Sequence, residues 1–296
     1  MAIRLVYPDE PMPVVPVAAK RSPLEIARAA GSNFLISFAF LSPGRRRALL
    51  AVYGFCRVVD DAVDLGDRDQ ANEHLVFWEN ELEAAFAATP QTPLGYALHR
   101  AAAQFGLDRE PFDEVCAGVR MDLADRTYAT FAELESYMRR VASAVGVACL
   151  PVFGADRERS RGYAERLGIA LQYTNILRDI GEDCDNGRCY LPLDALQEHN
   201  VDPSWLCSTP PGHAIADGGP IEKLLAAEHQ RADRLYDEAA ELLPQADRGA
   251  LRPARIMGTI YRDLRRRVEA RGAQSLVQPP VRVPLWRKVY LALFGI

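Results

Sequence analysis

Apolar residues recur every three or four positions along most of the chain after Pro23. This spacing places them on one face of an α-helix and indicates a series of amphipathic helices. The clearest case is PGRRRALLAVYGFCRVVDDAVD, where the pattern predicts a helix that begins at Pro43 and ends near Leu65 and Gly66. Its apolar stripe consists of Leu49, Val52, Tyr53, Cys56, Val59 and Val63.

Comparable patterns cover most of the remaining chain. PLEIARAAGSNFLISFAFL predicts a helix up to Gly31 that resumes beyond it. Further helices are expected over about 70–88, 93–105, 110–123, 131–153, 156–182, 221–244 and 250–270. The sequence shows neither strand-like alternation bounded by hairpin turns nor an internal repeat. It therefore predicts an all-α protein built as a single large helical bundle.

Proline and glycine mark the boundaries of this bundle. Residues 1–22 are expected to form an extended N-terminal arm, because they carry Pro8, Pro11, Pro13 and Pro16. DNGRCYLPLDAL marks a turn, and residues 202–220 have the composition of a loop. QPPVRVP separates a last short apolar segment. We therefore expect one helical domain over 23–272 and a C-terminal tail with a short helix over 273–296.

Composition narrows the class of protein. The 296 residues are 49% hydrophobic and 25% charged, which is typical of a globular chain with a large core. The net charge of −5 argues against nucleic acid as a partner, because phosphate binding favours a basic face. The six cysteines lie mostly singly in apolar segments, which favours reduced thiols and a cytoplasmic location. Cys184 and Cys189 form the only close pair and lack partners at zinc spacing.

The two ends of the chain give no pattern of a membrane span. The N-terminal stretch is too interrupted by proline and charge for a signal peptide. The apolar run VYLALFGI (289–296) is far shorter than the roughly 20 residues that cross a bilayer. We expect it to form a final helix docked on the protein body. The alternative is peripheral contact with the inner membrane surface, with Trp286, Arg287 and Lys288 at the lipid headgroups.

Candidate chemistry begins with a cluster of acids in RVVDDAVD (57–64). Asp60 and Asp64 stand four residues apart, so both carboxylates lie on one face of the predicted helix. Like charges at this spacing repel, and a cation relieves the repulsion. Oxygen ligands of this kind suit Mg²⁺, which binds one or two carboxylates, keeps several waters and bridges to substrate phosphates.

A second acidic face lies in LGIALQYTNILRDIGEDCDNGRCYLP. Its polar side chains follow at helical spacing and are Gln172, Asn175, Asp179 and Asp183. The opposite stripe is apolar and is expected in the core. Arg178 adjoins Asp179, as Arg57 lies three residues before Asp60. Guanidinium groups beside metal-binding acids favour a diphosphate ligand.

Other phosphate and metal motifs are absent. The sequence contains no G-x-G-x-x-G and no P-loop pattern. DCDNGRC does not begin a calcium loop, because Arg188 stands at the sixth position, where glycine is required, and Asp194 stands at the twelfth, where glutamate is usual. Two acidic helix faces in an apolar bundle instead predict a pocket with a polar, metal-binding mouth above an apolar interior. A long hydrocarbon with a diphosphate head fits such a pocket.

YGFCRVVDDAVD and LQYTNILRDIGEDCDNGRCYLP resemble the two signature regions of the phytoene/squalene synthase family, and the resemblance runs from about residue 24 to about residue 270. It implies the all-α isoprenoid-synthase fold with a central apolar cavity, and Mg²⁺-dependent head-to-head transfer between two prenyl diphosphates. Two or three Mg²⁺ ions are implied, with NADPH only if the product is reduced.

The resemblance also implies residue roles. The implied Mg²⁺ ligands are Asp60, Asp64, Asp179 and Asp183. The implied diphosphate contacts are Arg57, Gln172, Asn175, Arg178 and, further along the chain, Arg282. Tyr137, Tyr190 and Tyr261 are the tyrosines implied near the reacting ends. The implied lining of the cavity and substrate tunnel is Phe34, Phe38, Val141, Val145 and Gly146, all of which ordinary helix packing also explains.

Two departures from the family pattern concern the cavity. GSNF (31–34) stands where a Ser-x-Ser-Phe-like stretch is usual, so the first hydroxyl contact is missing or moved. Arg139 stands where an aromatic residue is common, which leaves the local cavity shape open.

The product is predicted from the same resemblance. Two farnesyl diphosphates would give presqualene diphosphate, and squalene with NADPH, as on the bacterial hopanoid route. Two geranylgeranyl diphosphates would give phytoene, the first carotenoid, and this is the alternative. Two further alternatives stay open: a Mg²⁺-dependent terpene cyclase, and a catalytically silent helical scaffold.

Overall fold

The computed structural model describes residues 15–30, 34–63, 67–124, 127–207, 210, 212–216 and 218–295, and within these it contains helices and no strands. The α-helices are α1 (Pro23–Ala29), α2 (Phe34–Phe38), α3 (Pro43–Ala62), α4 (Arg68–Phe86), α5 (Pro93–Phe105), α6 (Glu110–Leu123), α7 (Phe131–Met138), α8 (Ala144–Phe153), α9 (Arg157–Asp185), α10 (Leu193–Glu198), α11 (Pro220–Glu241), α12 (Arg252–Glu269) and α13 (Leu285–Phe294). The predicted all-α fold is confirmed.

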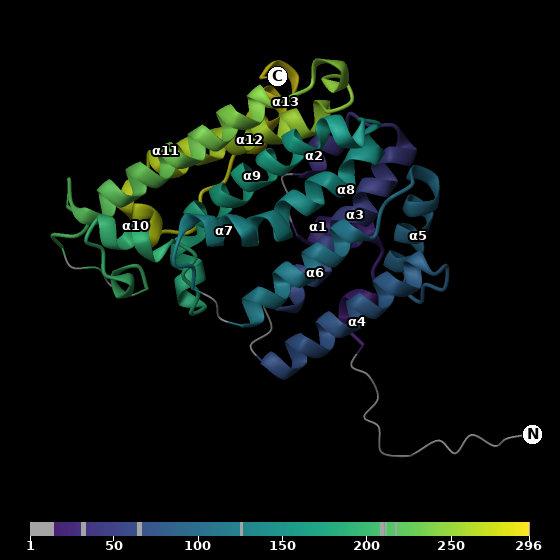
Figure 1. Ribbon diagram of the computed structural model, residues 1–296, viewed down its shortest axis with the longest axis horizontal. Coiled ribbons are helices and arrows are strands. Elements are labelled where there is room, and N and C mark those ends of the chain that lie inside the picture. Colours follow the sequence, from purple (N-terminus) through teal and green to yellow (C-terminus); the bar gives the residue numbers. More distant parts are fainter. Residues whose placement is uncertain are drawn as a thin grey trace, which may run out of the picture.

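α9 is the central helix of the bundle. It packs against α11 and α12 on one side and against α7 and α8 on the other, and Figure 1 shows α9, α11 and α12 running alongside one another. α3 forms a second centre, in contact with α1, α4, α5, α6 and α8. Because α8 touches both α3 and α9, it joins the two helices whose sequences carry the acidic motifs.

The apolar stripe predicted for α9 is buried as expected. Its members are Ile169, Tyr173, Ile176, Leu177 and Ile180. Polar groups within this core are satisfied in pairs: the hydroxyl of Tyr173 donates to Glu228 on α11, and Thr174 shares a 2.8 Å hydrogen bond with Tyr236. Burial without such partners would be costly, so these bonds fix how α9 and α11 pack.

The helix predicted over 131–153 is continuous in extent but not in geometry. A π-helical turn, η2 (Arg139–Ser143), separates α7 from α8. It is pressed between α6 and α9 at two glycines. A Cβ at Gly118 would stand 2.6 Å from Val141 Cγ1, and one at Gly168 would stand 2.7 Å from Ser143 Cα. π-turns of this kind are frequent at functional sites.

Segments outside the bundle differ in part from expectation. Residues 1–14 of the predicted arm lie outside the described residues, and Val17–Lys20 form a 3₁₀ turn rather than extended chain. The short helix α10 was not predicted, because its six residues are too few to show a helical period. The predicted loop contains the 3₁₀ turn η3 (Pro203–Trp205). The tail begins with the 3₁₀ turn η5 (Gly272–Leu276), which packs on α9, and ends in the predicted helix α13, which packs on α12.

The expectation of free thiols is wrong for two cysteines. Cys184 at the end of α9 and Cys207 in the following loop form a disulfide, with Cα atoms 4.7 Å apart. The pairing was not visible from spacing, because the loop folds back over 23 residues to meet the helix. Within the described part of the chain, no helix combines the length and the apolar character needed to cross a bilayer.

Candidate active site

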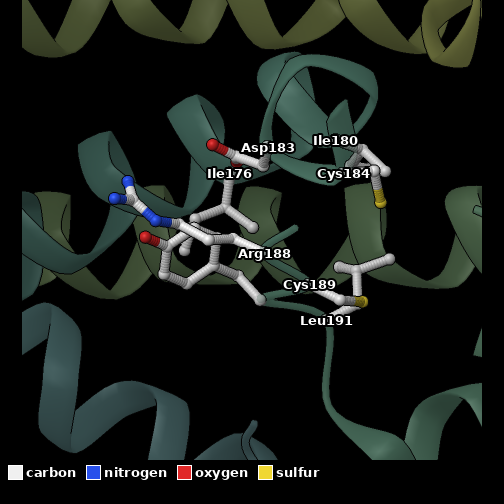
Figure 2. A pocket seen from close by; sticks show the side chains of 8 residues that line it. Ile176, Ile180, Asp183, Cys184, Arg188, Cys189 and Leu191 are labelled. Atoms are coloured by element: carbon white, nitrogen blue, oxygen red, sulfur yellow. The ribbon is translucent and has the colours of Figure 1, made fainter. Parts of the chain in front are cut away.

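A small pocket lies at the C-terminal end of α9, where the chain turns into the segment that follows (Figure 2). Its walls are Ile176, Ile180, Asp183, Cys184, Arg188, Cys189, Tyr190 and Leu191. The side chains of Asp183 and Arg188 extend toward the same side of the pocket, and Cys184 lies opposite (Figure 2). The cavity volume is about 10 Å³, roughly enough for one water molecule and far below the roughly 300–1,000 Å³ of sites for drug-sized ligands. The larger apolar cavity therefore stays a prediction.

Asp183 lines this pocket, and Asp179 lies one helical turn before it on α9. Burial, together with the negative charge of Asp179, raises the pKa of Asp183 from 3.8 to about 7. A carboxyl group in this position ionises fully near neutral pH only when positive charge is added. Arg188 supplies part of that charge and lowers the same pKa. The ionised form of this pair is therefore unfavourable, and a bound divalent cation would stabilise it.

The polar neighbours of this pair come from the same helix. The guanidinium of Arg178 donates from Nε to Asp179 Oδ1 at 2.7 Å. Asn175, one turn earlier, donates weakly to Gln172 Oε1 at 3.4 Å. The side-chain oxygen of Asn175, Oδ1, is buried without a hydrogen-bond partner. A buried acceptor with no donor is unusual, and it leaves this oxygen available as a ligand.

The other acidic motif ends α3. Arg57 forms an ion pair with Asp60 at 3.3 Å and a second one with Asp61. Asp64 lies outside the described residues. The two motifs meet at one point, where Arg188 Nη2 donates a 2.9 Å hydrogen bond to the carbonyl of Val63. The end of α3 therefore lies against the same arginine that faces Asp183.

The described side chains fit a divalent cation in part. No cluster of three or more His, Cys, Asp or Glu side chains forms a metal site among the described residues. Asp179, Asp183 and the unpartnered oxygen of Asn175 nevertheless offer the oxygen ligands that Mg²⁺ takes when substrate phosphates and waters complete its shell. This donor set fits magnesium better than zinc, which takes nitrogen and sulfur ligands.

A second group of side chains centres on Asp122 of α6, which the sequence analysis did not identify. Tyr137 and Tyr190 each donate a 2.9 Å hydrogen bond to this carboxylate, one to each oxygen. The two rings stack, with centroids 5.5 Å apart, and Tyr128 packs against both. Burial and the charge of Asp122 raise the pKa of Tyr137 and of Tyr190 far above the ordinary value. Both hydroxyls therefore stay protonated.

A signal for Asp122 does exist in the sequence. It follows Val115 and Val119 at steps of four and three, so an acid stands on the buried stripe of an amphipathic helix. A carboxylate is rarely buried unless it is paired, and the tyrosines supply the pairing. Arg188, the other residue that was missed, sits in a turn and gave no such signal.

The remaining predicted site residues fall into two groups. Tyr261 on α12 is buried and interacts electrostatically with Arg178, so it borders the site. Phe38 is buried in α2, whereas the side chain of Phe34 lies outside the described residues. Arg282 is exposed ahead of α13, and its charge acts on Lys288.

The predicted cavity residues of the π-turn region take part in helix packing. Val141 faces Gly118, and a Cβ at Gly146 would stand 2.9 Å from the carbonyl of Ala164 on α9. Val145 is half-buried beside them. Arg139 forms ion pairs with Glu135 and Glu165 and is not among the residues that line the pocket at the end of α9.

The helical bundle has the all-α fold of the squalene and dehydrosqualene synthases whose structures are solved. The chain belongs to the squalene/phytoene synthase family, whose profile matches residues 27–287. Members of this family are prenyltransferases that join two prenyl diphosphates head to head, and so this chain is a prenyltransferase.

The relatives and solved structures that this chain resembles carry four related activities. The presqualene diphosphate synthase of Sinorhizobium fredii is 37% identical and covers 86% of this chain and 89% of its own. The phytoene synthase of Arthrospira platensis is 32% identical, and the match covers 90% of this chain and 88% of that protein. Among solved structures, a dehydrosqualene synthase in complex with ligand superposes with a TM-score of 0.79 at 28% identity, covering 92% of each chain. The squalene synthase HpnC from Alicyclobacillus acidocaldarius superposes with a TM-score of 0.71 at 30% identity, covering 87% of this chain and 94% of its own.

Proposed function

We propose that this protein condenses two farnesyl diphosphates head to head to presqualene diphosphate, with release of one diphosphate. The observation that carries the proposal is the Asp179–Asp183 pair on α9, adjacent to the tyrosines held by Asp122. The farnesyl chain length is supported by the presqualene diphosphate synthases of Sinorhizobium fredii and Zymomonas mobilis, which are 37% and 34% identical to this chain.

Mg²⁺ is the metal we propose for the site. Asp179, Asp183 and Asn175 would hold it on α9, and Asp60 and Asp64 are the proposed ligands at the end of α3. When bound, Mg²⁺ neutralises charge on the diphosphate and makes it a better leaving group. The chain's own contribution is to supply oxygen ligands whose repulsion the ion relieves.

Arginines and apolar walls prepare the substrate. Arg178 and Arg57 pair with neighbouring aspartates. Guanidinium forks match the geometry of phosphate oxygens, so both arginines would also be able to bind the diphosphate. Ile176 and Ile180 line the pocket beside Asp183 and exclude water from the allylic cation that ionisation leaves behind.

The tyrosines act on that cation and on the proton lost when the cyclopropane ring closes. The ring faces of Tyr137 and Tyr190 stabilise positive charge. Because each hydroxyl donates to Asp122, its oxygen lone pairs remain free to accept. As the substrate C–H bond breaks, a tyrosine oxygen takes the proton and passes its own hydrogen to Asp122. Neither hydroxyl needs to ionise, consistent with their raised pKa values.

The test is incubation of the purified protein with farnesyl or geranylgeranyl diphosphate and Mg²⁺, with and without NADPH, followed by mass identification of the products. Presqualene diphosphate from the farnesyl substrate is the expected result. Phytoene from the geranylgeranyl substrate would establish the second candidate, which the phytoene synthase relatives favour. A cyclic terpene or a prenyl alcohol as the main product would overturn both.

A further inference from the structure

The final helix, α13, turns its more apolar face away from the body of the protein. Its inward face carries Leu291 and Ala292, which are buried, and Arg287, which donates to Asp263 of α12 at 2.9 Å. These contacts hold α13 against α12 and α2 at one edge of the bundle (Figure 1). The expectation of a helix docked on the body is therefore met, but the docking uses the less apolar face.

The outward face of α13 is entirely apolar. Its exposed side chains are Leu285 (68%), Trp286 (68%), Val289 (44%), Tyr290 (49%), Leu293 (49%) and Phe294 (73%). They recur at one, four, five, eight and nine residues after Leu285 and so form one continuous stripe. A surface helix normally turns its polar face to water. A stripe of this kind marks an interaction surface.

Uncompensated positive charge flanks the stripe at its start. Lys288 on α13 is half-buried, and this burial together with the charge of Arg282 lowers its pKa. Neither residue forms an ion pair within the described part of the chain. Asp263 beneath them is already shared between Arg267 and Arg287. The stripe therefore begins in a positively charged surround, although the whole chain has a net charge of −5.

Positive charge also surrounds the other end of the stripe. Thr259 Oγ1 contacts the carbonyls of both Gly295 and Arg255, which places the end of α13 one turn from Arg255. Partial burial and the charges of Arg248 and Arg252 lower the pKa of Arg255. No ion pair to a carboxylate involves these three arginines among the described residues.

We propose that the outward face of α13 docks on the surface of an anionic lipid bilayer, with the helix lying parallel to the membrane plane. Tryptophan and tyrosine favour the headgroup region, where an apolar ring and a polar tip are both satisfied. The flanking cations complement anionic lipid. This inference goes beyond the catalytic reaction and does not depend on it.

A second copy of the chain fits the stripe less well. Ten helical residues span about 15 Å, and a stable dimer needs about 800 Å² from each partner. A two-fold interface would also bring the same patch of both copies together. Lys288 and its neighbouring arginines would then face their own copies, and this like-charge contact opposes association. A lipid surface carries the opposite charge.

The test is co-sedimentation of the full chain with vesicles of phosphatidylcholine alone or phosphatidylcholine mixed with phosphatidylglycerol. The wild-type chain is expected to sediment with the anionic vesicles, and less so at high salt. The combined variant Trp286→Ser/Tyr290→Ser/Phe294→Ser should bind about tenfold more weakly or worse. Lys288→Glu should weaken binding to the anionic vesicles but not to the vesicles of phosphatidylcholine alone.

The matched control removes three exposed apolar side chains elsewhere, in Val17→Ser/Val76→Ser/Tyr96→Ser, and should bind as the wild type does. Circular dichroism and product formation from dispersed substrate should be unchanged in the α13 variant, since its three side chains lie on the surface. Equal vesicle binding by the α13 variant, or no binding by the wild type, would overturn the proposal. So would light scattering that shows a dimer which this variant splits, because the stripe would then join two copies.

Discussion

The hydroxyl of Tyr190 donates a 2.9 Å hydrogen bond to Oδ1 of Asp122, across 68 residues of sequence. This bond connects the segment after the second acidic motif to α6, which carries neither motif. Tyr137 binds the other oxygen of the same carboxylate. Asp122 thus positions two aromatic side chains from different parts of the chain at one edge of the pocket, and a change at Asp122 should act on both.

Replacement of Asp122 should separate positioning from proton transfer. Asp122→Asn keeps an oxygen acceptor for one tyrosine but loses the negative charge that receives the proton. We expect kcat to fall about a hundredfold, in the range of general-base catalysis, while KM for farnesyl diphosphate changes little. Steady-state kinetics with product quantified by mass provides the measurement.

Tyr190→Phe and Tyr137→Phe are the matched variants for this prediction. Each keeps the stacked ring and removes one hydroxyl from Asp122. If one hydroxyl carries the proton, its Phe variant should reproduce the loss of kcat in Asp122→Asn and the other should not. A wild-type kcat in Asp122→Asn would exclude Asp122 from the chemical step.

The raised pKa of Asp183 predicts how stability depends on pH. The folded protein holds this proton up to about pH 7, whereas the unfolded chain releases it near the ordinary value of 3.8. The group therefore destabilises the fold as pH rises from about 4 to about 7, and the effect levels off above that. Thermal melts of the metal-free protein should show Tm falling through this window.

Asp183→Asn is the control for this pH dependence. Without the titrating carboxyl, the decline of Tm between about pH 4 and pH 7 should be reduced. Mg²⁺ should raise the Tm of the wild-type protein more at pH 8 than at pH 5, because only the ionised carboxylate binds it. A wild-type melting profile in Asp183→Asn would show that this carboxyl is not the group that titrates.

Sequence patterns predicted the helices well where one face is buried and the other is not. The stripes of α3 and α9 follow the helical period closely, and the acids of α9 stand on the face opposite its apolar stripe. The site residues that were missed depend on tertiary contacts. Asp122 acquires its role only when Tyr137 and Tyr190 converge on it, and Arg188 acquires its role only when α3 reaches it.

Close backbone approach is equally invisible from the sequence. The sequence of the π-turn between α7 and α8, RRVAS, contains no residue pattern that predicts the extra residue per turn. The two glycines that accommodate the turn lie on other helices, Gly118 on α6 and Gly168 on α9. Their significance appears only once the three helices are placed together.

Gly168 provides a test of this packing. A methyl group there would stand 2.7 Å from the backbone of Ser143, which cannot move without shifting the π-turn. Gly168→Ala should lower the free energy of unfolding by about 1–3 kcal/mol. Gly162→Ala, six residues earlier on α9, meets nothing closer than 3.8 Å and should be neutral or stabilising by up to about 1 kcal/mol. Denaturant unfolding of the two variants gives both values, and equal stabilities would contradict the tight packing.

The metal assignment is tested most directly at one aspartate from each motif. Asp179→Ala removes the carboxylate that pairs with the half-buried Arg178, and Asp60→Ala leaves Arg57 paired with Asp61. The fold should survive in both, with an unchanged far-ultraviolet dichroism spectrum. Turnover should fall by a factor of about a thousand or more, since the diphosphate would lose charge stabilisation as it leaves.

Chelation of divalent ions should abolish the wild-type activity, and added Mg²⁺ should restore it to the wild type but not to the variants. Full activity in either variant at saturating Mg²⁺ would remove that residue from the proposed ligands.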